Sequence, residues 1–106
     1  MLRLDELLNK GIKSGKPFVL STVLKTCGSV PQSPGARMIV FVDGSTAGTI
    51  GGGCVEGSVI KKSIRMIADE KESGTEIISV NLTDPLNQKN GDICGGSMSV
   101  LLESFL

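Results

Sequence analysis

Apolar side chains recur along the chain at helical spacing in two segments. The first lies near the N-terminus and comprises Leu4, Leu7, Leu8 and Ile12. The second follows the glycines at 51–53, and at about 100° per residue its apolar members share one side of a helix over 54–72. These members are Val55, Val59, Ile60, Ile64, Ile67 and Ala68. The pattern predicts two amphipathic helices, the first ending at Gly11 or Gly15, the second with Gly53 as N-cap and Gly74 just past its end.

Strand-like segments separate and follow these helices. Residues 18–24 (FVLSTVL) and 37–42 (RMIVFV) are rich in apolar and β-branched residues, and Asp43-Gly44 is typical of a turn before a weaker strand at 45–50. Residues 76–82 and 97–106 complete the set. This order predicts an α/β fold in which one mixed β-sheet of about five strands is covered by two main helices, with residues 1–106 forming a single domain.

The composition argues against several classes of function. Eleven basic and eleven acidic residues give zero net charge, and the chain has no Trp or Tyr and only three Phe, so it offers neither the basic field nor the stacking surface of a nucleic-acid-binding protein. No apolar run reaches the ~20 residues of a membrane-spanning helix. The first residues, MLRLDELLNK, carry acids within their apolar pattern, which is not typical of a signal peptide. The expected location is therefore the cytoplasm.

The chain has three cysteines and no histidine. An odd number of cysteines fits reduced thiols better than a secreted disulfide framework. The absence of histidine excludes Ser-His and Cys-His catalysis. Cys27 adjoins a predicted strand and is interpreted as a buried, space-filling residue. The cysteine separations lack the CxxC pairing of structural zinc sites, so zinc is not expected.

Two cysteines lie beside glycines in positions suited to chemistry. Cys54 follows the glycines at 51–53 in the predicted first turn of a helix, where free N–H groups and the helix dipole stabilise a thiolate. Cys94 precedes Gly95-Gly96, whose N–H groups can line a concavity for an anion. The glycines at 51–53 also allow a plain turn or a dinucleotide loop. The second fits poorly, because the preceding DGSTAGTI is too polar for a first Rossmann strand.

The loop at residues 28–38 (GSVPQSPGARM) allows two interpretations. Its two prolines stiffen the backbone and Gly35-Ala36 permits close approach, which suits the wall of a ligand site. A plain connection between strands is equally compatible. Arg37 is the one strong charge of the loop, and it either pairs with an anion or extends its head group into water.

Together these motifs resemble the N-terminal domain of the XdhC/CoxI family, the maturation factors of molybdenum hydroxylases such as xanthine dehydrogenase and carbon monoxide dehydrogenase. The matching residues, in the order of the family, are Gly28-Ser29 and Pro31, Gly35-Ala36 with Met38, the stretch GTIGGGCVE from Gly48 to Glu56, and Cys94-Gly95-Gly96 with Glu103. Many relatives have a basic residue after the loop proline, where this chain has Gln32. The Rossmann-type domain that follows in the family lies outside these 106 residues.

The resemblance implies a cofactor-binding chaperone rather than an enzyme with turnover. It would bind the molybdenum-pterin cofactor transiently, protect it during sulfuration by a cysteine desulfurase, and deliver it to the apo-hydroxylase. A separate chain carrying the Rossmann-type domain and a second copy in a homodimer are further possible partners. The expected cofactor-binding residues are Gly51, Gly52, Gly53, Cys54, Cys94, Gly95, Gly96, Ser29 and Arg37, with Cys54 as the candidate contact to molybdenum.

Two other functions fit the same residues. In a sulfur-transfer protein, Cys54 would carry a persulfide and Cys94 would resolve it. In a scaffold, the wide apolar side of the helix at 54–72 would contact the hydroxylase, although burial in the domain's own core accounts for that side as well.

Overall fold

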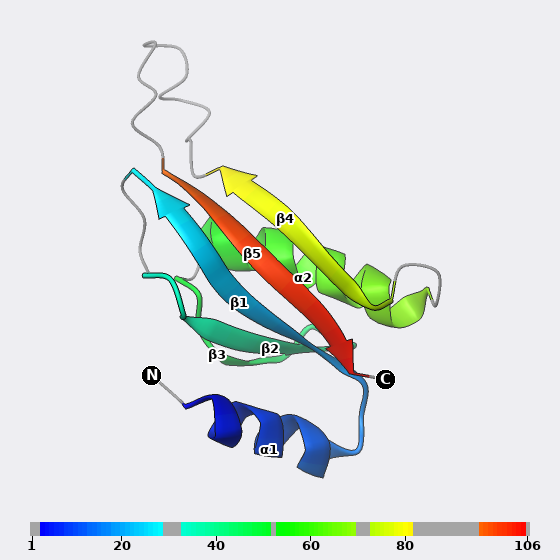
Figure 1. Cartoon of the computed structure of the whole chain (residues 1–106). Coiled ribbons are helices and arrows are strands. Elements are labelled where there is room, and N and C mark those ends of the chain that lie inside the picture. Colours follow the sequence, from blue (N-terminus) through cyan, green and yellow to red (C-terminus); the bar gives the residue numbers. More distant parts are fainter. Residues whose placement is uncertain (1–2, 29–32, 52, 70–72, 82–95, 106) are drawn as a thin grey trace.

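The computed structural model of the chain describes residues 3–28, 33–51, 53–69, 73–81 and 96–105. Five strands form one sheet and two helices pack against it, one on each face (Figure 1). The elements are α1 (Leu4–Ser14), β1 (Phe18–Cys27), β2 (Arg37–Phe41), β3 (Thr46–Gly48), α2 (Gly53–Ala68), β4 (Thr75–Asn81) and β5 (Ser97–Phe105). The predicted α/β fold, with its order of elements, is confirmed.

The sheet has the strand order β3-β2-β1-β5-β4, and each neighbouring pair is antiparallel. The expectation of a mixed sheet was therefore wrong in the direction of the strands. β1 and β4 do run the same way, but β5 lies between them and runs in the opposite direction. Because the last strand inserts between two earlier ones, no parallel neighbours arise among the five described strands.

The face of the sheet covered by α2 holds the larger core. Buried residues of α2 pack against alternate residues of the central strands, as expected for an amphipathic helix on a pleated surface. The main members are Val19, Val23, Met38, Val40, Val55, Val59, Met66, Met98, Val100 and Leu102. Ile60 and Ile67 are half-buried against the same cluster. Much of the wide apolar side of α2 is thus used within the chain itself.

The opposite face is only partly covered. α1 buries Leu7 against Phe18, Leu20 and Ile39, with the partly buried Leu8, Phe41 and Ala47 around them. The part of this face formed by β4 and β5 lies beyond α1, as Figure 1 shows. Ile77 on β4 is 62% exposed and Phe105 on β5 is 40% exposed. Apolar side chains therefore remain accessible on this part of the sheet.

Glycine explains how α1 ends and how closely it approaches β1. Gly15 adopts the left-handed conformation (φ 68°) and its N–H donates to the carbonyl of Ile12, at 3.2 Å. Of the two predicted ends, Gly15 is correct. Gly11 instead lies against Phe18, where an added Cβ would be 2.5 Å from the aromatic ring. The ring occupies the space that any larger residue at position 11 would need.

Other boundaries differ by a few residues from the sequence prediction. β1 continues to Cys27, past a register shift between Val23 and Lys25. α2 includes Gly53 rather than starting after it, and ends at Ala68, so Gly74 (φ 117°) precedes β4 instead of closing the helix.

The predicted Asp43-Gly44 turn is confirmed, and Gly44 has φ 88°. The hydroxyl and the N–H of Ser45 donate hydrogen bonds to the carboxylate of Asp43, and these bonds lower the pKa of Asp43.

Neither helix is long and apolar enough to cross a lipid bilayer, as judged over the described part of the chain.

Candidate functional site

The antiparallel topology brings three connections to one end of the sheet. They are residues 28–36 between β1 and β2, 49–52 between β3 and α2, and 82–96 between β4 and β5. Cys27 and Asn81 both pair with Ser97, so the first and third connections begin at neighbouring strand ends. Gly48, where the second connection begins, pairs with Met38 next to the start of β2. Each candidate cofactor-binding residue belongs to one of these connections or to the element that follows it. The fold therefore gathers at one end the three segments that the sequence singles out.

The glycine segment before α2 is held by a glutamate of the helix. The hydroxyl of Thr49 donates to Oε2 of Glu56, and the N–H of Ile50 donates to the same oxygen at 3.2 Å. The N–H of Gly51 donates to Oγ1 of Thr49 at 3.0 Å. A glutamate near the start of a helix commonly accepts a backbone N–H from the residues just before it. Glu56 does so with the N–H of Ile50.

This network limits which backbone groups are available to a ligand. The N–H groups of Ile50 and Gly51 are already used within the chain, and the carboxylate of Glu56 adds negative charge beside them. The N–H groups that remain as candidates for an anion are those of the first turn of α2, which have no intrahelical acceptors. Gly53 and Cys54 are the first two residues of that turn.

Gly48 has a steric role immediately before this segment. It has φ 81°, and an added Cβ would lie 2.6 Å from the backbone carbonyl oxygen of Arg37. A contact of that length with rigid backbone cannot be relieved by a side-chain rotation. A residue with a Cβ would therefore push apart the start of β2 and the end of β3, from which the glycine segment departs.

Arg37 lies on the other side of the sheet from α2. It is the first residue of β2, and side chains alternate between the two faces along a strand. Its neighbour Met38 belongs to the core under α2, whereas Ile39 packs with α1. Arg37 is half-buried and its Nη1 donates to the carbonyl of Gly35 at 3.4 Å. The sheet thus stands between Arg37 and the helix that carries Cys54.

The remaining candidate residues are described only in part. Gly96 is buried directly before β5. Gly51 has φ 127°, a conformation that favours glycine. Ser29, Gly52, Cys94 and Gly95 lie outside the described residues. Among the residues that are described, no group of three or more cysteine and acidic side chains is placed to hold a metal ion.

Cys27 was predicted to fill space in the core, and that prediction is wrong. Cys27 is the last residue of β1 and is exposed. With Lys25, Ser97 and Ser99 it lines a concavity of about 240 Å³ at the end of the sheet that carries the three connections. The register shift at Leu24 places Lys25 opposite Ser99 and Cys27 opposite Ser97. Gly28, which directly follows Cys27, was the feature of the sequence that could have indicated the end of the packed strand at this position.

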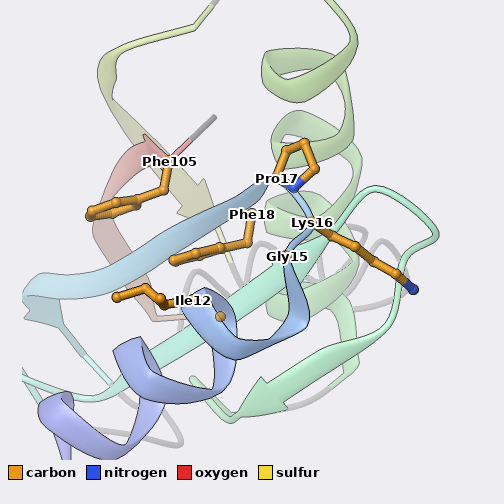
Figure 2. A pocket seen from close by; sticks show the side chains of 7 residues that line it. Ile12, Gly15, Lys16, Pro17, Phe18 and Phe105 are labelled. Atoms are coloured by element: carbon orange, nitrogen blue, oxygen red, sulfur yellow. The ribbon is translucent and has the colours of Figure 1, made fainter.

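A larger hollow of about 510 Å³ lies at the opposite end of the sheet, where β1 begins and β5 ends (Figure 2). Ile12 and the rings of Phe18 and Phe105 form its apolar wall, and Lys16 and Pro17 belong to its rim. The two rings are stacked with centroids 4.9 Å apart. None of the candidate cofactor-binding residues lines this hollow.

The fold and these loops define a class of small α/β protein, in which an antiparallel sheet carries glycine-rich connections at one end. The chain belongs to the XdhC and CoxI family, whose profile matches residues 12–79. This match covers most of the described secondary structure, from the end of α1 to β4. The family resemblance stated from the sequence is thereby confirmed.

Individual relatives agree with the family assignment. The chain is 35% identical over 86 residues to the uncharacterized protein YqeB of Escherichia coli (strain K12), covering 81% of this chain and 15% of that protein. It is 32% identical over 63 residues to the molybdenum cofactor insertion chaperone PaoD of the same organism, covering 59% of this chain and 20% of PaoD. A crystal structure described as a xanthine dehydrogenase from Bacillus halodurans matches with a TM-score of 0.70 and 27% identity, over 93% of this chain and 29% of that one.

The chain thus spans less than a third of the length of each of these proteins.

Proposed function

We propose that this protein is an accessory chaperone that binds the molybdenum-pterin cofactor during maturation of a molybdenum hydroxylase such as xanthine dehydrogenase. Membership of the XdhC and CoxI family supports the proposal, and so does the similarity to a molybdenum cofactor insertion chaperone. The partners that follow from it are the apo-hydroxylase and a cysteine desulfurase that sulfurates the cofactor. Such a protein would act in the cytoplasm without turnover of its own.

The observation that carries this proposal is that the three connections leave the same end of the sheet. The molybdenum-pterin cofactor has a soft metal centre and a phosphate, so it needs a thiolate and N–H donors within one site. Cys54 and the first turn of α2 offer both, and Gly96 lies beside the neighbouring strand ends. When bound, the cofactor supplies the metal chemistry, while the chain holds and shields it.

Within this proposed site the residues would have different roles. Cys54 contacts the metal centre, and the glycines at 51–53 and 95–96 let the cofactor approach the backbone. Glu56 holds the glycine segment through Thr49 and Ile50 and does not itself contact the cofactor. Cys94 and Ser29 complete the site from the other two connections. Arg37, separated from α2 by the sheet, contributes at most at the rim through the loop that contains Gly35.

Anaerobic binding of the molybdenum-pterin cofactor tests the proposal. Cofactor released from a donor enzyme is mixed with the protein, which is then separated by size and analysed for molybdenum. Wild type is expected to retain the cofactor and Cys54→Ser to lose it. Cys27→Ser is the matched control, because Cys27 is an exposed thiol of the same end of the sheet and is not assigned to the site. Absence of retention by folded wild type, or equal loss in both variants, contradicts the assignment to Cys54.

Sulfur transfer is a second candidate, because a thiolate in the first turn of a helix is also suited to carry a persulfide. After incubation with a cysteine desulfurase and cysteine, the mass of the intact protein distinguishes the two functions. A persulfide adds the mass of one sulfur atom, and peptide mapping shows whether Cys54 bears it. A protein that binds the cofactor but gains no sulfur is a chaperone only.

A further inference from the structure

β4 is the longer of the two edge strands of the sheet. It has seven residues (Thr75–Asn81), whereas β3 at the other edge has three (Thr46–Gly48). All seven residues of β4 pair with β5 on the inner side. On the outer side no strand of the described chain lies next to it (Figure 1). Such an edge presents backbone N–H and C=O groups that are available to pair with another strand.

β4 lacks the features by which edge strands usually avoid pairing. Its sequence, TEIISVN, contains no proline, glycine or lysine, and its register with β5 continues without a bulge. Its one charged residue, Glu76, is bound to Lys62 of α2 with 3.1 Å between the carboxylate and the ammonium. Nothing in the strand itself therefore opposes the addition of another strand.

An exposed apolar side chain lies in the middle of this edge. Ile78 pairs with Val100 and packs against the core under α2, so its neighbour Ile77 points from the other face of the sheet. α1 covers a different part of that face, and Ile77 is 62% exposed. Burial of Ile77 would remove apolar surface from water in addition to pairing the backbone.

We propose that β4 pairs antiparallel with β4 of a second copy of this chain, about a twofold axis at Ile78. An antiparallel edge is complementary to itself under a twofold axis. In this register all seven residues are paired, with Ile77 opposite Ser79 and Thr75 opposite Asn81 of the second copy. Glu76 lies opposite Val80, so no like charges face each other, and each chain has zero net charge. The dimer joins two sheets into one and leaves the connections of the candidate site outside the paired strands.

Sedimentation velocity over a range of concentrations tests the dimer. Wild type is expected to sediment with twice the chain mass of 11.1 kDa. Ile77→Lys is expected to halve that mass, because it places two ammonium groups as diagonal neighbours across the new strand pair. Ile12→Lys is the matched control, since Ile12 is 68% exposed on α1, and it is expected to leave the dimer intact. Circular dichroism checks that each variant is folded.

A charge-pair rescue tests the register. Because Ile77 of each copy lies opposite Ser79 of the other, the double variant Ile77→Lys with Ser79→Glu places opposite charges face to face at two positions and is expected to restore the dimer. Wild type that remains a monomer at every concentration overturns the proposal. So does Ile77→Lys that stays dimeric, which would locate the interface elsewhere. Failure of the rescue contradicts the register centred on Ile78.

Discussion

At the scale of single residues, Glu56 shows how one side chain can shape a loop that precedes its own helix. Its carboxylate accepts hydrogen bonds from the hydroxyl of Thr49 and the N–H of Ile50, and Thr49 in turn accepts from Gly51. Glu56 lies in the first turn of α2, where a glutamate commonly accepts a backbone N–H. Its actual partners depend on the path of the glycine segment, which the sequence pattern did not reveal.

Replacement of this carboxylate should loosen the start of α2. Glu56→Ala is expected to lower the free energy of unfolding by about 1–2 kcal/mol, because the N–H of Ile50 loses a charged acceptor. Glu56→Gln keeps an acceptor oxygen and should cost less. Urea unfolding measures both. A double-mutant cycle with Thr49→Val should show coupling between the two side chains, and additive effects would argue against their hydrogen bond.

Ser63 presents the opposite case, a buried polar side chain whose hydroxyl makes no hydrogen bond within the described structure. It is fully buried on α2, and its hydroxyl has no hydrogen-bond partner among the described atoms. Such a group costs about 1–3 kcal/mol relative to one that is satisfied. Ser63→Ala is therefore expected to raise the free energy of unfolding by about 1 kcal/mol.

The exposed Ser58 of the same helix provides the control for Ser63. Ser58→Ala shares the gain in helix propensity but should change stability by no more than about 0.5 kcal/mol. Urea unfolding of both variants separates the two contributions. Equal effects would mean that the hydroxyl of Ser63 carries no cost of burial.

At the scale of elements, each helix contains a glycine whose surroundings decide its effect. Gly11 of α1 lies against the ring of Phe18, at a distance that leaves no room for a Cβ. Gly57 of α2 has open space where its Cβ would be. Both positions are helical, so helix propensity alone favours alanine at each by roughly 0.5–1 kcal/mol. Only the packing of the elements distinguishes the two residues.

The two alanine variants should therefore have effects of opposite sign. Gly57→Ala is expected to stabilise the protein by about 0.5–1 kcal/mol. Gly11→Ala is expected to destabilise it by about 1–3 kcal/mol, because it forces Phe18 away from its stack with Phe105. Thermal and urea unfolding measure both, and near-ultraviolet circular dichroism reports the phenylalanine environment. Stabilisation by Gly11→Ala would show that Phe18 moves aside without cost.

At the scale of the whole molecule, the sheet depends on its last strand. β5 lies between β1 and β4 and pairs with both over nearly its whole length, from Ser97 to Phe105. Its pairing with β1 joins residues from the two ends of the chain. Contacts of such long sequence separation form late and make folding slow. The larger core also needs Met98, Val100 and Leu102 of β5.

A chain that ends at Asn81 should consequently not fold. Without β5, β4 has no neighbour and β1 loses one of its two partners. The truncated chain is expected to lack the cooperative thermal transition of the full chain, as followed by far-ultraviolet circular dichroism. A peptide of residues 96–106, which supplies the sequence of β5, provides a further check. If the strand signal in circular dichroism returns only when this peptide is added, its return depends on β5. Cooperative melting of the truncated chain alone would contradict this dependence.

Local patterns in the sequence determined the elements of this protein. Hydrophobic periodicity and turn residues depend on neighbours within a few positions, so they located both helices, all five strands, the end of α1 at Gly15 and the Asp43-Gly44 turn. The motifs around Gly51–Cys54 and Cys94–Gly96 indicated the family, which the profile match confirms.

Only the tertiary structure decided how these elements combine. The insertion of β5 between β1 and β4 makes the sheet antiparallel and brings three distant connections to one end. The insertion also leaves β4 as an open edge. The packing of the sheet against the two helices places Arg37 on the face opposite α2, and Cys27 is exposed at the end of β1. These properties arise from pairings between residues far apart in the chain. A strand carries in its own sequence the signal to be a strand, but not the identity of its neighbours.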